Sequence, residues 1–169
     1  MKKIHIKVML LLLAAAVAAV LLTGCGSSSK KASSEAANVN LSEFVSAVEN
    51  VDPVKDPRKI DDFALENELG LEKDNISKYK GVITNSQDDC ALIFIAKTKS
   101  GKTDAVKDGL ETYRDGLTEN DLYAENADKI DKAKEARVEV RGNYVIMVIA
   151  GVDSDYSRID KAIDRAFES

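Results

Sequence analysis

Residues 90–96 read CALIFIA and residues 144–152 read YVIMVIAGV, two apolar runs that decide the fold. A strand covered on one face alternates between apolar and polar residues, whereas a strand covered on both faces is continuously apolar. We therefore expect the two runs to be the central strands of a sheet with material packed on both faces. Either the two helices expected at the start of the domain cover the second face, or a partner or ligand does. We favour the helices, because their own apolar stripes need burial.

The strands that flank these two are less apolar. Residues 77–84 carry Lys78 and Lys80 on one face, and residues 137–141 alternate strictly. Charged side chains on an outer strand discourage edge-to-edge pairing, so we expect both segments at the edges of the sheet. Gly142-Asn143 is a dipeptide that favours a two-residue hairpin turn. These connections predict a mainly antiparallel, four-stranded sheet.

Helical spacing of apolar residues occurs in the segments between the strands. We expect a helix from Leu41 that ends before Asp52-Pro53, and a short helix over Ile60–Leu69. A third helix should start at Thr103 or Asp104, with Val106, Leu110, Tyr113 and Leu117 on its buried face. Glu119–Glu135, which carries Leu122, Tyr123 and Ile130, is expected to be a short helix or an irregular link, and a last helix should be capped by Asp153 or Ser154. Gly109 and Gly116 each cost about 1 kcal/mol relative to Ala, so the third helix is expected to be less regular than its apolar pattern suggests. The order α-α-β-β-α-β-β-α predicts an α+β domain.

The N-terminal segment has the organisation of a signal peptide. Met1–Lys7 contains three lysines and no acid, and Val8–Leu22 is apolar throughout. As a helix that run reaches about 22 Å, short of the roughly 30 Å hydrocarbon core. Leu22-Thr23-Gly24-Cys25 resembles the lipobox of bacterial lipoproteins. The resemblance implies cleavage between Gly24 and Cys25 and alkylation of the Cys25 thiol by diacylglycerol.

Three regions follow from this interpretation: a lipoprotein signal peptide (1–24), a lipidated cysteine with a flexible tether (25–40), and one α+β domain (41–169). The alternatives are an ordinary signal peptide with a chance cysteine and an uncleaved anchor. Residues 26–40 read GSSSKKASSEAANVN, which is too polar to bury a core of its own.

Processing at Cys25 would change the chemistry that the chain offers. It would remove Lys2, Lys3, Lys7 and His5, leaving 21 of the 24 basic residues against 29 acidic residues and no histidine. Ser-His-Asp and Cys-His nucleophiles and His-ligated metal sites are then excluded. An acidic balance also disfavours nucleic acid as a partner. We expect no cofactor, no metal and no catalytic residue.

Three local features can be interpreted either as structural or as chemically functional. Cys90 is the only thiol outside the lipobox, and we expect a small buried hydrophobe rather than a reactive group. Asp88 and Asp89 are expected to be solvated turn residues rather than ligands of a hard cation. Residues 153–157 (DSDYS) resemble the start of a calcium loop, but Gly at position six and Glu at position twelve are missing, so helix capping is the better interpretation.

Two segments carry a further resemblance. Residues 97–102 (KTKSGK), which lead into Val106-Lys107, and residues 141–145 (RGNYV) resemble, in order and spacing, the domain-of-unknown-function family DUF4358, small lipoproteins of Gram-positive bacteria. The resemblance extends from about residue 41 to the C-terminus. It implies a location and an architecture, and it supplies no activity or catalytic residues.

The function expected from the sequence is that of a lipid-anchored lipoprotein on the extracytoplasmic face of the cell membrane. We expect a non-enzymatic binding or accessory module, held at the membrane by diacylglycerol on Cys25, with an envelope protein as its candidate partner. The alternatives are an envelope hydrolase that uses carboxylates and tyrosine, and a structural subunit of an envelope complex.

Overall fold

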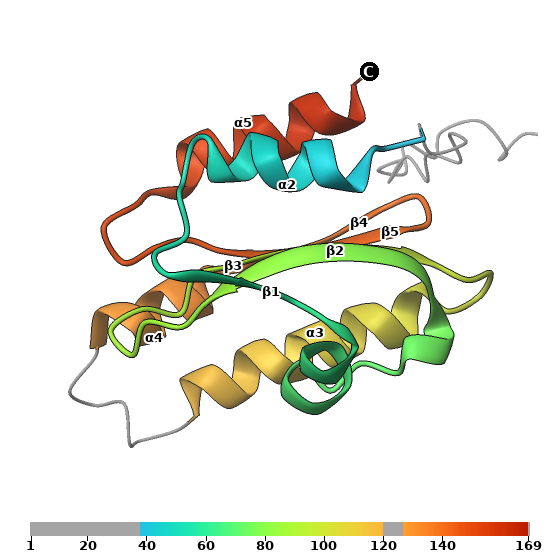
Figure 1. The fold of residues 1–169 in the computed structure, drawn as a ribbon, viewed down its shortest axis with the longest axis horizontal. Coiled ribbons are helices and arrows are strands. Elements are labelled where there is room, and N and C mark those ends of the chain that lie inside the picture. The colour runs from blue at the N-terminus through green and yellow to red at the C-terminus, as the bar shows by residue number, and fades with distance from the viewer. Residues whose placement is uncertain (1–37, 120–126, 169) are drawn as a thin grey trace, which may run out of the picture. The chain divides into compact units, whose positions relative to one another are not determined.

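An antiparallel sheet with helices on both faces organises the domain (Figure 1). The computed structural model describes residues 38–119 and 127–168; the predicted signal peptide, Cys25, and most of the predicted tether lie outside these ranges. The described strands are β1 (Pro57–Lys59), β2 (Ile76–Thr84), β3 (Leu92–Thr98), β4 (Arg137–Arg141) and β5 (Tyr144–Ile149), in the spatial order β1-β2-β3-β5-β4. The predicted α+β class is confirmed, with the two apolar strands β3 and β5 paired at the centre.

The predicted count of four strands is wrong, because the described residues form five. The missed strand β1 has three residues, too few to show a period of two, and it begins with a proline. β1 pairs with β2 from Pro57↔Thr84 to Lys59↔Val82. The first half of β2 therefore pairs with β3 on one side and lies beyond the end of β1 on the other. Over that half, the lysine-bearing strand is at the edge of the sheet, as predicted.

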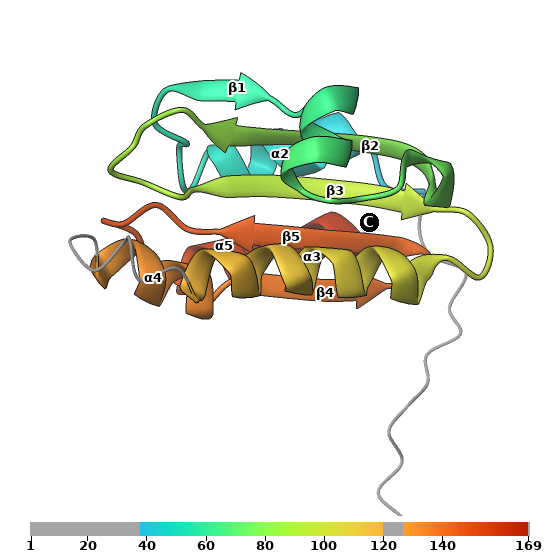
Figure 2. The ribbon, with the colours of Figure 1, turned by 90° about the horizontal axis from the view of Figure 1, so that it is seen from below.

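Helices cover both faces of the sheet, as the continuous apolar runs require. Helices α2 (Leu41–Glu49) and α5 (Tyr156–Phe167) lie on one face. Helices α3 (Thr103–Thr118) and α4 (Ala127–Lys134) lie on the other, together with the π-helical turn η1 (Ala64–Glu68) and the 3-10 turn η2 (Lys73–Asn75). Figure 2 shows α3 running along β5 and β4, with η1 beside it over β2 and β3.

The two N-terminal helical segments were expected to share one face, and this expectation is wrong. Helix α2 packs with α5, whereas η1, which replaces the longer helix expected over Ile60–Leu69, packs on the α3 side. Alternate residues of the central strands divide accordingly: Ile93, Ile95, Tyr144, Ile146 and Val148 face α2 and α5, and Leu92, Phe94, Ala96, Val145, Met147 and Ile149 face α3. Each face thus joins an early segment to a late one.

Helix α3 is continuous through both of its glycines, contrary to the predicted irregularity. A Cβ on Gly109 would lie 2.7 Å from Leu71 Cδ2, so this glycine makes room for the chain that follows η1. A Cβ on Gly116 would meet nothing within 4 Å. For the segment over residues 119–135, the short helix is the one of the two alternatives that forms, as α4; Leu122 and Tyr123 lie outside the described residues.

Two glycine substitutions test the packing of the sheet. A Cβ on Gly81 in β2 would lie 2.7 Å from both Ile93 O and Ile60 Cδ1, so Gly81→Ala should lower the free energy of unfolding by about 1–3 kcal/mol. Gly116→Ala should raise it by about 1 kcal/mol, because the helix gains propensity without a clash. Urea unfolding followed by circular dichroism measures both, and effects of the same sign would contradict the packing described.

Candidate functional site

A groove lined by four lysines lies where the chain enters the described fold; we call it the lysine groove. Its volume is about 620 Å³. It is lined by residues 38–42 at the start of α2, residues 76–80 of β2, Lys73, Lys97 and Tyr144. Lys78, Lys80 and Lys97 lie on the α2 and α5 face of the sheet, since their strand positions share the register of the residues that point there.

The register places like charges opposite each other in this groove. Lys78 of β2 pairs directly with Lys97 of β3, an arrangement that destabilises a sheet unless an anion lies nearby. Lys97 Nζ lies 5.5 Å from the centre of the Tyr144 ring. Among the described residues, no ion pair neutralises Lys78, Lys80 or Lys97. The N-terminus of α2, which the Asn40 side chain caps, also lines the groove and adds no negative charge, because helix N-termini are positive.

A second pocket, of about 520 Å³, lies at the opposite end of β3 and contains Cys90. The Cys90 thiol donates to the main-chain oxygen of Lys129 at 3.4 Å, and burial raises its pKa to about 11. Lys129 is itself buried, and its ammonium donates to the main-chain oxygen of Gln87. A protonated thiol is a poor nucleophile. The expected role of Cys90 as an apolar packing group fits its place beside the α3 core.

The two aspartates before Cys90 differ from each other. Asp88 is exposed, as predicted, but Asp89 is only 7 % exposed, so its expected place as a solvated turn residue is wrong. Asp89 Oδ1 accepts hydrogen bonds from the N–H groups of Cys90 (2.7 Å) and Ala91 (3.1 Å), which draws the side chain beneath its own loop. Asp89 Oδ2 is buried without a hydrogen-bond partner.

Sequence reasoning also assigned the wrong residues to the cap of α5. Asp155 caps this helix, with its carboxylate accepting from the Ser157 N–H at 2.7 Å. Asp153 instead pairs with Lys55 at 2.9 Å, and this hydrogen bond lowers the pKa of the exposed Asp153 carboxyl. The hydroxyl of Ser154 points away from the helix toward the loop that follows α2.

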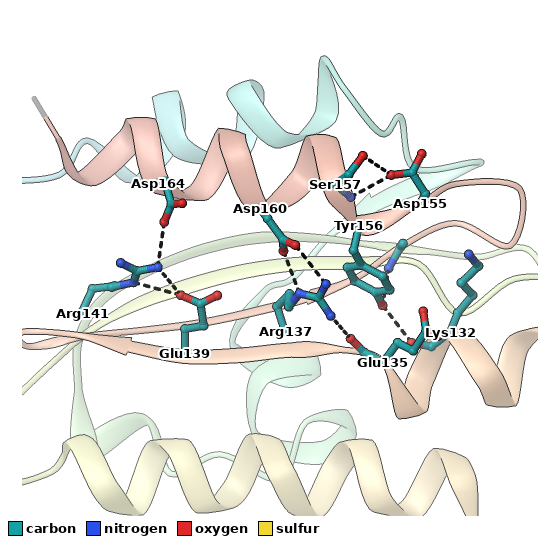
Figure 3. A network of polar contacts seen from close by, with 11 residues as sticks. Lys132, Glu135, Arg137, Glu139, Arg141, Asp155, Tyr156, Ser157, Asp160 and Asp164 are labelled. Carbon is teal, nitrogen blue, oxygen red and sulfur yellow. Dashed lines mark hydrogen bonds and ion pairs between the residues drawn. The ribbon is translucent and has the colours of Figure 1, made fainter. Parts of the chain in front are cut away.

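A network of titratable groups joins β4 to α5 (Figure 3). Arg137 donates from Nε and Nη2 to the two carboxylate oxygens of Asp160, at 2.7 and 3.0 Å, and its guanidinium lies 4.1 Å from the centre of the Tyr156 ring. Tyr156 Oη donates to Lys132 O (2.8 Å) and accepts from the Ala150 N–H (3.1 Å). Burial raises the pKa of Tyr156 to about 12. These contacts tie α5 to β4, to α4 and to the residue after β5.

Metal centres and membrane-spanning helices are the two remaining classes of site. In residues 38–119 and 127–168, no group of three or more His, Cys, Asp or Glu side chains is arranged to hold a metal ion. None of the helices in these ranges has the length and apolarity needed to span a bilayer.

The Cys90 thiol should react slowly in the folded protein. In a Cys25→Ala chain, alkylation by iodoacetamide at pH 8 is expected to be at least about a hundredfold slower than for free cysteine, because the thiolate fraction is small at a pKa of about 11. Unfolding in urea should restore the rate of free cysteine. Mass spectrometry of timed samples measures both rates, and equal rates in the two states would show an accessible thiolate.

Comparison with known proteins places this fold in a family. No curated protein and no solved structure matches the chain. The family model described as domain of unknown function DUF4358 matches residues 50–150, from the end of α2 to the residue after β5. This range contains the whole sheet and more than half of the chain. The chain therefore belongs to the DUF4358 family.

Proposed function

We propose that the protein is a lipid-anchored extracytoplasmic lipoprotein and a non-enzymatic binding module, whose lysine groove takes phosphate-bearing anions at the membrane surface. The observation that carries this proposal is the position of the groove. Asn38, Val39 and Asn40 line it, and Asn38 follows the lipobox cysteine Cys25 by thirteen residues. The groove is thus the part of the described fold nearest, along the chain, to the proposed anchor.

Chain length limits how far the groove can lie from a bilayer. Thirteen residues span at most about 45 Å when fully extended, and less as a coil. The lysines of the groove would therefore be held close to the lipid headgroups by the covalent anchor. Tethering of this kind raises the effective concentration of the surface at the groove, so that weak individual contacts suffice.

Charge complementarity supports the choice of ligand. The chain downstream of the lipobox is acidic overall, so that most of its surface is repelled by an anionic membrane. Lys78, Lys80 and Lys97 form a local exception, with Lys78 facing Lys97 across the ladder. A phosphate group bound between them would offset their mutual repulsion. Phosphate at the membrane surface is therefore the ligand chemistry that the groove favours.

The lipid anchor is tested by replacing the lipobox cysteine. Cys25→Ala should abolish incorporation of labelled fatty acid and leave an unprocessed precursor, because the thiol is the acceptor of diacylglycerol. Cys90→Ala is the matched control, which removes the other cysteine and should leave labelling intact. Labelling that persists in Cys25→Ala and is lost in Cys90→Ala would refute the anchor.

The groove is tested with the chain that begins at residue 26, which contains every residue that the structure describes. Binding to vesicles that contain phosphatidylglycerol should fall by about fivefold for each of Lys78→Gln and Lys80→Gln, since one lysine near an anionic surface contributes about 1 kcal/mol. Lys134→Gln in α4 changes the net charge equally and should have no effect. Co-sedimentation at low salt measures the binding.

Phosphatidylcholine vesicles provide the second arm, and they should bind none of the variants. Equal losses in Lys78→Gln and Lys134→Gln would show that net charge alone governs binding, and would remove the groove from the proposal. The anchor is measured separately, so that either part can fail alone.

A further inference from the structure

Three loops bring oxygen atoms together at the end of the sheet opposite the lysine groove. These are the loop after α2, which carries Asp52, the loop before β3, which carries Asp89, and the loop after β5, which carries Gly151 and Ser154. The pairing of Leu92 with Ile149 brings the second and third loops side by side. The arrangement involves neither the lipobox nor the groove.

Asp52 holds the first loop to the third. Its Oδ2 accepts the Gly151 N–H at 3.0 Å, and its Oδ1 accepts the hydroxyl of Ser154. Asp52 is 4 % exposed. Sequence reasoning assigned this residue only to the end of the first helix, because nothing in the local pattern indicates a contact about a hundred residues away.

Asp89 contributes the second carboxylate and an atom without a partner. Its Oδ1 is used by the N–H groups of Cys90 and Ala91, but its Oδ2 accepts no hydrogen bond, although it is buried. Buried polar atoms in folded proteins are almost always satisfied by protein, water or an ion. Asp89 Oδ2 therefore marks the place of a group that completes the structure.

The space in front of this oxygen is bounded by Gly151. A Cβ built on Gly151 would lie 3.5 Å from Asp52 Oδ1, 3.6 Å from Asp89 Oδ2 and 3.8 Å from Ser154 Oγ. One point is thus surrounded by oxygens from all three loops, and the residue beside it lacks the side chain that would fill the space. We call this arrangement the oxygen cradle.

Charge decides between the groups that the cradle could hold. Asp52 and Asp89 are both buried, and they place two carboxylates around one space. The buried Lys129 lines the same pocket as Asp89, and its ammonium donates to the main-chain oxygen of Gln87. The nearby Lys55 is exposed and paired with Asp153. Two buried carboxylates that face one space repel each other, and a water molecule would satisfy the hydrogen bond without offsetting that repulsion. A cation would do both.

We propose that the oxygen cradle binds a calcium ion between Asp52, Asp89 and Ser154. Carboxylate and hydroxyl oxygens are ligands of hard cations, and calcium accepts six to eight of them in a flexible geometry, whereas magnesium demands a near-ideal octahedron. With two carboxylates, fewer than a high-affinity site uses, the expected dissociation constant is of the order of 10⁻⁴–10⁻³ M, as in extracellular calcium modules. Water and main-chain oxygens complete the coordination.

The experiment measures thermal unfolding of the full chain, isolated from cells in a non-ionic detergent, with calcium chloride as the probe. At calcium ten times its dissociation constant, the folding equilibrium constant should rise about elevenfold, seen as a higher Tm. Magnesium chloride at the same ionic strength is the control for general screening of acidic residues. Terbium luminescence sensitised by tyrosine reports occupancy directly, because Tyr156 accepts from Ala150, the residue before Gly151.

Two variants place the effect at the cradle. Asp89→Asn removes one charge, and Gly151→Ala puts a methyl group in the cradle at ordinary contact distances. Each should abolish both the Tm shift with calcium and the terbium signal. Asp88→Asn, an exposed neighbour in the same loop, should retain both. Should Asp89→Asn fail to fold, Gly151→Ala still gives the answer, because its backbone and its neighbours accept alanine.

The outcomes that overturn the proposal are equally specific. A wild-type Tm that calcium does not shift, with no terbium signal, means that a buried water satisfies Asp89 Oδ2. A Tm shift with magnesium as large as the shift with calcium means that calcium only screens the acidic surface elsewhere. A calcium-dependent Tm shift that is retained in both Asp89→Asn and Gly151→Ala means the same.

Discussion

Burial of β3 and β5 on both faces is the constraint from which the rest of the structure follows. The side chains of these strands are almost completely removed from water, so that each face needs its own helical layer. One layer is α2 with α5 and the other is α3 with η1, so that neither the early nor the late part of the domain can complete a core alone. Packing uses nearly every side chain along the two central strands. Polar chemistry is therefore confined to the strand ends.

The sequence predicted what repeats and missed what depends on contacts between distant residues. The apolar runs fixed the central strands, and the stripe of α3 predicted Val106 and Leu110 as buried. Strand β1 was not predicted, because three residues show no period and because it pairs with β2, whose Val82 lies far along the chain. The burial of Asp89 was not predicted for a related reason. A pair of aspartates in a turn is normally solvated, and only the fold brings the loops of Asp52 and Gly151 over it.

The cap of α5 shows how two local signals compete. Asp153, Ser154 and Asp155 can each cap a helix, and their order in the chain does not choose between them. Tertiary contacts remove two of the three, since Asp153 pairs with Lys55 and Ser154 donates to Asp52. Asp155 is left to accept from the first turn of the helix. Tertiary contacts also decide the partners of the charged residues in β4. The alternating pattern predicted that these charges face outward, but it did not predict that Arg137 and Arg141 pair with Asp160 and Asp164 of α5.

Positive side chains cluster at one end of the sheet and negative side chains at the other. Repulsion within each cluster destabilises the fold. Lys78 faces Lys97 at the end where the described chain begins, and Asp52 and Asp89 are buried together at the other. Sequences that fold well usually avoid such conflicts, and those that persist are typical of places where function sets the residue. The rigid two-sided core supplies the stability that tolerates them. Because the conflicts lie at opposite ends of strands joined by an uninterrupted ladder, relief of one by a ligand need not disturb the other, and the two ends can bind independently.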